Sequence, residues 1–157
     1  MIDEGSKAVP FELADAYGKK VKMEDFVGKF VVLYFYPKAL TSGCTKEAQD
    51  FRDNYKAFTK LGAEVIGISG DKQETLKKFI DKEKLPFLLL SDLDFSVCKE
   101  YNVYKEKSMY GRKYMGIERS TFLIDKKGIV RHIWRKVKVA GHIQEVLKQL
   151  ETIAGKV

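Results

Sequence analysis

The chain has 157 residues and a mass of 18.0 kDa, the usual size of one domain with a substantial core. Hydrophobic residues make up 45% and charged residues 32%, which excludes a disordered, collagen-like or membrane-embedded chain. Two cysteines are too few for the disulfide framework of a small secreted protein. The 29 lysines and arginines exceed the 22 acidic residues and give a net charge of +7.

This positive charge does not point to a nucleic-acid partner. Lysines are spread along the chain and mixed with carboxylates, as in residues 81–84, which is typical of solvated helix faces. Only residues 131–138 are purely basic, and their alternation with apolar residues predicts an exposed strand. We expect no nucleic-acid partner, because a dedicated binder concentrates its basic residues in one patch.

Signals for export or membrane insertion are not found in the sequence. The N-terminus lacks the basic start and apolar run of a signal peptide. The longest apolar stretch, residues 30–36, is far too short to span a bilayer. We therefore expect a cytoplasmic, thiol-reducing location without a membrane partner, where cysteines are reactive or buried rather than bridged.

The first segments of the chain predict a hairpin followed by a buried strand. Residues 11–13 and 21–23 alternate in polarity on either side of Gly18, which predicts a β-hairpin. Residues 30–36 are a continuous run of β-branched and aromatic side chains, typical of a central strand buried on both faces. Pro37 ends that strand.

Helices and strands alternate in the rest of the chain. Apolar residues at helical spacing predict one helix over residues 48–61, ended by Gly62. Asp71, with Glu74 three residues on, predicts the start of a second helix after a strand at 64–69. The remaining predicted elements are a strand at 87–90, a short helix at 94–101, strands at 120–124 and 129–137, and a C-terminal helix over 143–153.

This order of elements predicts an α/β fold. Strands that alternate with helices need a central, partly parallel sheet covered on both faces. The last two strands and the last helix complete a mixed sheet flanked by helices. We expect a thioredoxin-like fold with an N-terminal hairpin extension and a β-α insertion, forming a single domain over residues 1–157.

Cys44 occupies a position where chemistry is expected. With Thr41 or Ser42 as N-cap, it falls in the first helical turn after the central strand. Backbone N–H groups and the positive end of the helix dipole favour a thiolate there. The alternative is a buried structural cysteine, but the small and polar neighbours of Cys44 predict a solvent-facing turn. We therefore interpret Cys44 as a reactive cysteine at the carboxyl edge of the sheet.

The segment from Pro37 to Cys44 has the pattern P-x-x-x-T-x-x-C, which resembles the active-site motif of the peroxiredoxins. It has the matching context, with a hydrophobic strand before it and a helix after it. The resemblance extends over nearly the whole chain and is to the PrxQ group, also called the bacterioferritin comigratory protein (BCP) group. It is carried by Phe11-Glu12-Leu13 with Gly18 and by residues 25–29, 32–38, 67–69, 89–92, 110–114 and 119–125.

The resemblance implies a thiol-dependent peroxidase that reduces hydrogen peroxide and organic hydroperoxides. Cys44 is the implied nucleophile, which becomes a sulfenic acid. Thr41 is implied to place its hydroxyl against the thiolate and the peroxide, and Pro37 to shield the pocket. Arg119 is the implied active-site arginine, which stabilises the thiolate and the developing oxygen charge.

Further roles follow from the same resemblance. Glu47 corresponds to a position that orients the arginine, with a solvated helix carboxylate as the alternative. Arg52 is a candidate cation behind the site. The backbone N–H groups of Gly43 and Cys44 are expected to bind the peroxide oxygens, as donors at a helix N-terminus bind anions. The sequence gives no reason to expect a cofactor or a metal.

The second cysteine of many members of the group is missing. They carry it five residues after the first, where this chain has Gln49. Cys98, the only other thiol, lies in a predicted helix that points it towards the core, and we favour a buried structural role. The expected reductant is then an external small thiol or a thioredoxin- or glutaredoxin-like protein. The alternative is Cys98 as an unusual resolving cysteine after local unfolding.

Other classes of protein fit the sequence less well. A thioredoxin-like disulfide oxidoreductase needs C-x-x-C, which Cys44 does not begin. Two cysteines and two distant histidines lack the spacing of zinc ligands, and we expect His132 and His142 at the surface. A redox sensor or holdase that uses Cys44 without turnover is the alternative function. We expect a monomer or a weak homodimer.

Overall fold

The computed structural model describes residues 2–155. Its strands are β1 (Glu12–Asp15), β2 (Lys20–Lys22), β3 (Phe30–Phe35), β4 (Ala63–Ser69), β5 (Leu88–Ser91), β6 (Tyr104–Met109), β7 (Arg112–Ile117), β8 (Ser120–Ile124) and β9 (Val130–Trp134). Its helices are the 3₁₀ helix η1 (Met23–Phe26) and α1 (Ser42–Asp53), α2 (Tyr55–Lys60), α3 (Gln73–Glu83), α4 (Ser96–Glu100) and α5 (His142–Ala154).

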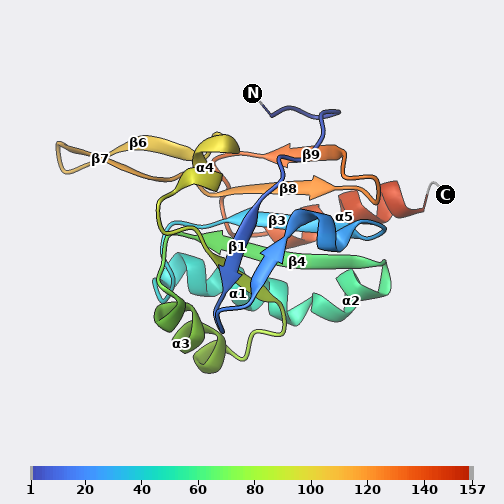
Figure 1. The fold of residues 1–157 in the computed structure, drawn as a ribbon, viewed down its shortest axis with the longest axis horizontal. Coiled ribbons are helices and arrows are strands. Elements are labelled where there is room, and N and C mark those ends of the chain that lie inside the picture. Colours follow the sequence, from blue (N-terminus) through green and yellow to red (C-terminus); the bar gives the residue numbers. More distant parts are fainter. Residues whose placement is uncertain (1, 156–157) are drawn as a thin grey trace.

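Seven of the strands form one mixed sheet, in the order β2-β1-β5-β4-β3-β8-β9 (Figure 1). β3, β4 and β5 are parallel, whereas β8, β9, β1 and β2 pair antiparallel. The predicted N-terminal hairpin is confirmed as β1 and β2. No helix within residues 2–155 is both long and apolar enough to cross a bilayer.

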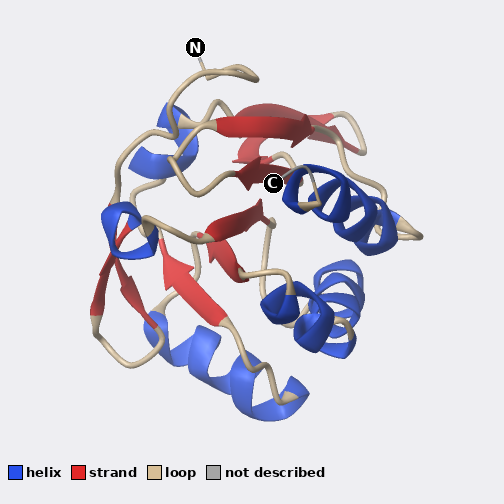
Figure 2. Ribbon diagram, turned by 90° about the vertical axis from the view of Figure 1, so that its right-hand side faces the viewer, coloured by secondary structure: helices blue, strands red, loops and turns tan. Residues whose placement is uncertain are grey.

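β3 is buried on both faces, as its continuous apolar sequence predicts. All six residues are buried, and successive side chains enter opposite cores because the strand period is two. Val32 and Tyr34 pack with side chains of α1, α2, α3 and α5, while Val31 and Leu33 pack with side chains of α4 and the N-terminal segment. The sheet therefore has helices on both faces, and Figure 2 shows helices bordering the strands.

One predicted helix is divided in two by the structure. Instead of a single helix over residues 48–61, α1 ends at Asp53 and α2 begins at Tyr55. Between them, Asn54 has φ −107° and ψ 6°, and its side-chain amide donates to the carbonyl of Asp50 at 2.8 Å. An asparagine side chain that competes for backbone hydrogen bonds favours such a break.

The predicted helix start at Asp71 is wrong. α3 begins at Gln73, and Lys72 is the N-cap without a side-chain cap. The carboxylate of Asp71 instead accepts hydrogen bonds from Ser69 Oγ at 2.7 Å and from the amide of Ala39 at 2.8 Å. Asp71 therefore fixes the loop that follows β3.

Two further features were not predicted. β6 and β7 form a separate hairpin that projects from the body of the molecule at the left of Figure 1. The expectation of a surface position for His142 is also wrong: it is 3% exposed, and its Nε2 lies 2.8 Å from Thr121 Oγ1. Burial, followed by the charge of Arg119, lowers the pKa of His142 to about 4, so the ring is neutral.

Candidate active site

Cys44 lies at the carboxyl edge of the sheet, in the first turn of α1. The loop residues 40–43 are exposed as expected, but the thiol points inward and is 2% exposed. It packs in the same apolar cluster as Ala48 and Phe51. The predicted solvent-facing turn is therefore confirmed for residues 40–43, while the thiol that it carries is buried.

Arg119 reaches this thiol from the short segment between β7 and β8. Its Nη2 donates to the sulfur of Cys44 at 3.4 Å, and its Nη1 donates to Glu47 Oε1 at 2.6 Å. Its side chain is 16% exposed, which limits screening by water. One guanidinium thus bridges a thiol and a carboxylate that lie three residues apart on α1.

Glu47 is fully buried, so the alternative of a solvated helix carboxylate is wrong. Burial raises the pKa of Glu47 to about 7, although the neighbouring charge of Arg119 acts in the opposite direction. Within residues 2–155 its second oxygen, Oε2, has no hydrogen-bond partner. The carboxylate is therefore held by Arg119 alone, and it holds Arg119 in turn.

The backbone of Gly43, next to Cys44, lies close to the Arg119 guanidinium. A Cβ atom on Gly43 would lie 3.3 Å from Arg119 Nη2, a tight contact that the glycine avoids. The first hydrogen bond around the helix start joins the amide of Thr45 to the carbonyl of Thr41 at 2.8 Å. The amides of Gly43 and Cys44 precede this bond, at the end of a helix where N–H groups favour anions.

Thr41 and Pro37 lie at the rim of the site. Thr41 is the N-cap of α1, but its hydroxyl makes no cap bond and donates to the carbonyl of Lys38 at 2.7 Å. Among the described residues, the hydrogen bond to the sulfur comes from Arg119, so the expected contact of Thr41 with Cys44 is not made. Pro37 is half-buried and follows the end of β3.

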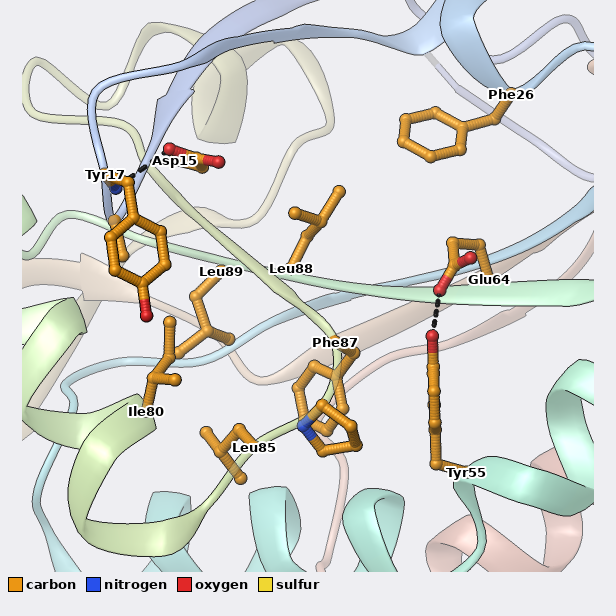
Figure 3. Close-up of a pocket in the computed structure, with 12 residues that line it drawn as sticks. Asp15, Tyr17, Phe26, Tyr55, Glu64, Ile80, Leu85, Phe87, Leu88 and Leu89 are labelled. Atoms are coloured by element: carbon orange, nitrogen blue, oxygen red, sulfur yellow. Dashed lines mark hydrogen bonds between the residues drawn. The ribbon is translucent and has the colours of Figure 1, made fainter.

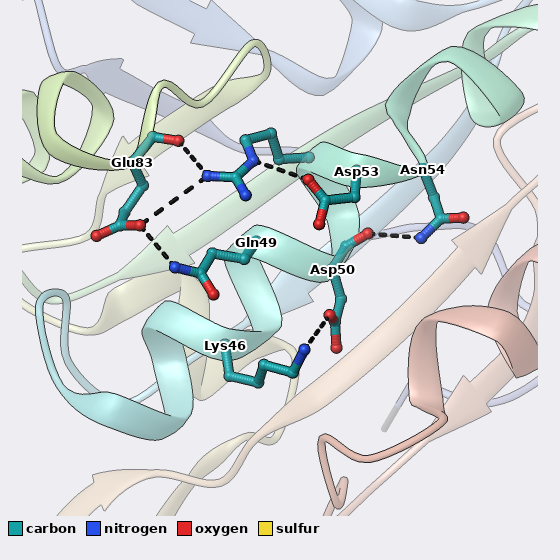
Figure 4. A network of polar contacts seen from close by, with 7 residues as sticks. Lys46, Gln49, Asp50, Asp53, Asn54 and Glu83 are labelled. Atoms are coloured by element: carbon teal, nitrogen blue, oxygen red, sulfur yellow. Dashed lines mark hydrogen bonds and ion pairs between the residues drawn. The ribbon is translucent and has the colours of Figure 1, made fainter.

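Arg52 belongs to another network, whose members Gln49, Asp53 and Glu83 are labelled in Figure 4. Its Nη1 donates to the carbonyl of Glu83 at 2.7 Å, and its Nε donates to Asp53 at 3.0 Å. Gln49 joins the same group by donating to Glu83 Oε1 at 2.8 Å. The expectation of a cation behind the thiol is therefore wrong for Arg52, which connects α1 to the end of α3.

Cys98 is fully buried in the second core, on the opposite face of the sheet from Cys44. Burial raises the pKa of its thiol, and the carboxylate of Asp92 acts in the same direction. Asp92 also accepts the amide of Cys98 at 2.8 Å. Both cysteines are free, and the surroundings of Cys98 favour the structural role over the resolving role.

Lys107 was missed by the sequence reasoning. It lies on β6, and burial followed by the charge of Arg119 lowers its pKa, while the nearby Cys44 acts the other way. Lys107 is therefore within electrostatic range of both groups. The signal for it was weak, because β6 is a charged and largely exposed strand without an apolar face.

A cavity of 380 Å³ lies elsewhere, between α2, α3 and the hairpin of β1 and β2 (Figure 3). It is mainly apolar, and its two carboxylates are already engaged: Asp15 accepts the amides of Tyr17 and Lys19, and Glu64 accepts the hydroxyl of Tyr55 at 2.6 Å. It contains no cysteine. Among the described residues, the candidate reactive site is therefore the group of Cys44, Glu47 and Arg119, which contact one another.

The sequence matches a family model and is similar to several known proteins. Residues 5–133 match the model of the AhpC/TSA family. The chain is 50% identical to "Peroxiredoxin Bcp" of Bacillus subtilis, over 99% of both chains. It is 46% identical to "Peroxiredoxin Bcp" of Escherichia coli K12, over 96% of both chains.

Solved structures are similar in fold as well as in sequence. The bacterioferritin comigratory protein of Xanthomonas campestris superposes with a TM-score of 0.87 at 42% identity, covering 92% of both chains. A cysteine-to-serine variant of PrxQ from Xylella fastidiosa gives a TM-score of 0.93 at 35% identity, covering 98% of both chains. These similarities confirm the α/β, thioredoxin-like class that the order of elements predicted.

Proposed function

The chain belongs to the AhpC/TSA family, and from this premise we propose that Cys44 is the nucleophile that attacks the peroxide. The protein is a peroxiredoxin of the PrxQ/BCP group and a thiol-dependent peroxidase. The observation that carries the assignment of Cys44 is its contact with Arg119, which in turn is held by the buried Glu47.

The first step transfers one oxygen to sulfur. The thiolate of Cys44 attacks the terminal oxygen of the peroxide, the O–O bond breaks, and Cys44 becomes a sulfenic acid while an alkoxide or hydroxide leaves and takes up a proton. Sulfur is oxidised by two electrons and the peroxide is reduced by two. Arg119 Nη2 is positioned to stabilise the thiolate and then the negative charge that develops on oxygen.

The remaining groups would position the peroxide. The amides of Gly43 and Cys44 are placed to donate to its oxygens at the helix N-terminus. The Thr41 hydroxyl would have to turn from the carbonyl of Lys38 towards the sulfur when substrate binds. Pro37 would keep water from the sulfur side of the loop. Glu47 acts through Arg119 and is a positioning residue.

The second step returns Cys44 to the thiol. Peroxiredoxins draw the electrons from thiol or thioredoxin reductants, and we propose a thioredoxin- or glutaredoxin-like protein or a small thiol for this chain. Gln49 stands where a second cysteine was expected, and Cys98 is buried on the far face of the sheet. Organic hydroperoxides are proposed beside hydrogen peroxide, because the Xanthomonas relative is described by its alkyl peroxide reduction activity.

Peroxide consumption in the presence of a dithiol tests this function. The wild type and Cys98→Ala should consume hydrogen peroxide and an alkyl hydroperoxide, whereas Cys44→Ser should not. Activity that survives in Cys44→Ser would overturn the assignment of the nucleophile. A wild type that forms a sulfenic acid on Cys44 but never turns over would favour the sensor or holdase function.

A further inference from the structure

We propose that α3 and the loop before it hold α1 in its helical form, so that the sulfenic acid of Cys44 is reduced in place by a thiol from another molecule. The residues that hold α1 are Gln49 and Arg52 at one end and Ala39, through Asp71, at the other. The inference rests on the proposed function, because it concerns the oxidised state of Cys44.

Gln49 and Arg52 attach the C-terminal half of α1 to Glu83, the last residue of α3; Figure 4 labels Gln49 and Glu83. Gln49 Nε2 donates to the Glu83 carboxylate at 2.8 Å, and Arg52 Nη1 donates to the Glu83 carbonyl at 2.7 Å. Glu83 is only 9% exposed, so these hydrogen bonds are largely shielded from water. A cation at the carbonyl end of a helix is also favoured by the helix dipole.

The other attachment lies just before α1. The amide of Ala39 donates to Asp71 Oδ2 at 2.8 Å, and Ser69 Oγ donates to the same oxygen at 2.7 Å. Asp71 immediately precedes the N-cap of α3. Cys44 therefore lies between two attachments to α3 and its flank, and the fully buried Phe51 adds an apolar anchor from α1.

Helix geometry shows what these attachments prevent. Residues five apart on an α-helix have Cα atoms about 8–9 Å apart and point about 140° away from each other. A disulfide needs Cα atoms within about 7 Å, so a thiol at position 49 can reach Cys44 only when α1 unwinds. In this chain the residue at position 49 carries no thiol and also opposes the unwinding.

The oxidised site then depends on two thiols from outside. The first, RSH, attacks the sulfenic sulfur of Cys44 and forms Cys44–S–S–R with release of water. The second attacks this mixed disulfide, returns Cys44 to the thiol and leaves RSSR. The two thiols lose two electrons in total, which balances the reduction of the sulfenic acid.

A cysteine placed at position 49 measures how firmly α1 is held. Gln49→Cys, Gln49→Cys/Arg52→Met and Gln49→Cys/Lys46→Met are each treated with one equivalent of hydrogen peroxide, and the 44–49 disulfide is quantified over time by peptide mass spectrometry. Lys46→Met is the matched control, because it removes an exposed α1 ion pair with Asp50 and leaves the attachment to α3 intact. Hydrogen exchange of the α1 amides in Arg52→Met and Lys46→Met gives a second measurement without a new thiol.

We expect slow disulfide formation in Gln49→Cys, about tenfold faster formation once Arg52 is replaced, and a change within about twofold for the Lys46 control. α1 amides should exchange faster in Arg52→Met than in Lys46→Met. Disulfide formation in Gln49→Cys as fast as Cys44 is oxidised, or equal effects of the two methionine substitutions, would overturn the inference. Failure of the wild type to form any dimedone-reactive sulfenic acid on Cys44 would instead contradict the proposed function.

Discussion

Arg119 Nη2 lies 3.4 Å from the sulfur of Cys44, a residue 75 positions earlier in the chain. The contact joins the start of α1 to the segment between β7 and β8, which are brought together because β3 and β8 are neighbours in the sheet. The same guanidinium is oriented by Glu47. The fold thus places a guanidinium, held in a fixed direction, against the thiol of Cys44 at the edge of the sheet.

Replacement of Arg119 by methionine should slow the reaction of Cys44 with hydrogen peroxide about 10²–10³-fold, because the charge that stabilises the developing oxyanion is lost. Arg119→Lys should react at a rate between those of the wild type and Arg119→Met, since one ammonium cannot bridge Cys44 and Glu47 as a planar guanidinium does. Stopped-flow kinetics measures both. Arg131→Met is the control, because its ion pair joins β9 to Asp125, at the opposite end of β8 from Arg119. Equal rates for wild type and Arg119→Met would contradict this role.

The burial of Glu47 predicts a pH-dependent effect of Glu47→Gln on the free energy of unfolding. The pKa of Glu47 is raised from 4.5 to about 7 in the folded state, so the folded state binds more protons between these values. Stability from this group is present at low pH and lost as pH rises through about 7. The free energy of unfolding of Glu47→Gln minus that of the wild type should therefore increase by up to about 3 kcal/mol as the pH is raised from about 5 to about 8. Urea unfolding at both pH values tests this, and a pH-independent difference would contradict it.

Gly43→Ala should separate activity from stability. The new methyl group would lie 3.3 Å from Arg119 Nη2 and displace the guanidinium by a few tenths of an ångström. We expect the rate with peroxide to fall about tenfold, since small misplacements of an oriented charge are costly. The melting temperature should not fall, because alanine is the better helix former. A lower melting temperature with an unchanged rate would show that the glycine serves packing instead.

His142 should make the fold sensitive to acid. Its folded pKa of about 4 lies below the ordinary histidine pKa of 6.5, so the unfolded state binds more protons in that interval and stability falls as pH drops through it. The free energy of unfolding should decrease by about 2 kcal/mol from this group as the pH is lowered from about 7.5 to about 5. His142→Gln should remove this part of the slope while it keeps a partner for Thr121. Thermal unfolding at a series of pH values measures it, and an identical slope in both proteins would argue against the assignment.

Much of the fold could be predicted because its strongest sequence patterns are local. The apolar run of β3 and the hydrophobic stripe of α5 each determine their own element, whatever the rest of the chain does. The hairpin of β6 and β7 could not be predicted in this way, since its charged strands show no continuous apolar stripe. Of residues 104–117, only Tyr104 and Ile117, at the base of the hairpin, pack against the core, and the two strands pair with each other along their length. The break at Asn54 depends on a single side-chain hydrogen bond, which a helical pattern does not reveal.

In the candidate site, too, the residues within local motifs could be predicted, whereas those whose contacts are remote in sequence could not. Cys44 and Arg119 were identified by motif and resemblance, and their contact in the structure supports the roles proposed for them. The burial of Glu47 could not be predicted, because a lone carboxylate on a helix is usually solvated and its partner Arg119 lies 72 positions away in the sequence. Arg52 was assigned wrongly because its partner Glu83, on α3, is equally remote in sequence. Contacts of this kind are decided by tertiary packing, which carries no periodic signal.

The central sheet lies between the two thiol groups of the chain, those of Cys44 and Cys98. Cys44 belongs to the core on one face and Cys98 to the core on the other, with β3 buried between the two cores. As long as the sheet is intact, the Cys98 thiol cannot reach an oxidised Cys44, so the electrons that reduce Cys44 come from outside the molecule. Turnover would then follow the supply of thiols around the protein. When that supply runs short, the oxidised form should accumulate, and its amount would report the thiol status of the compartment.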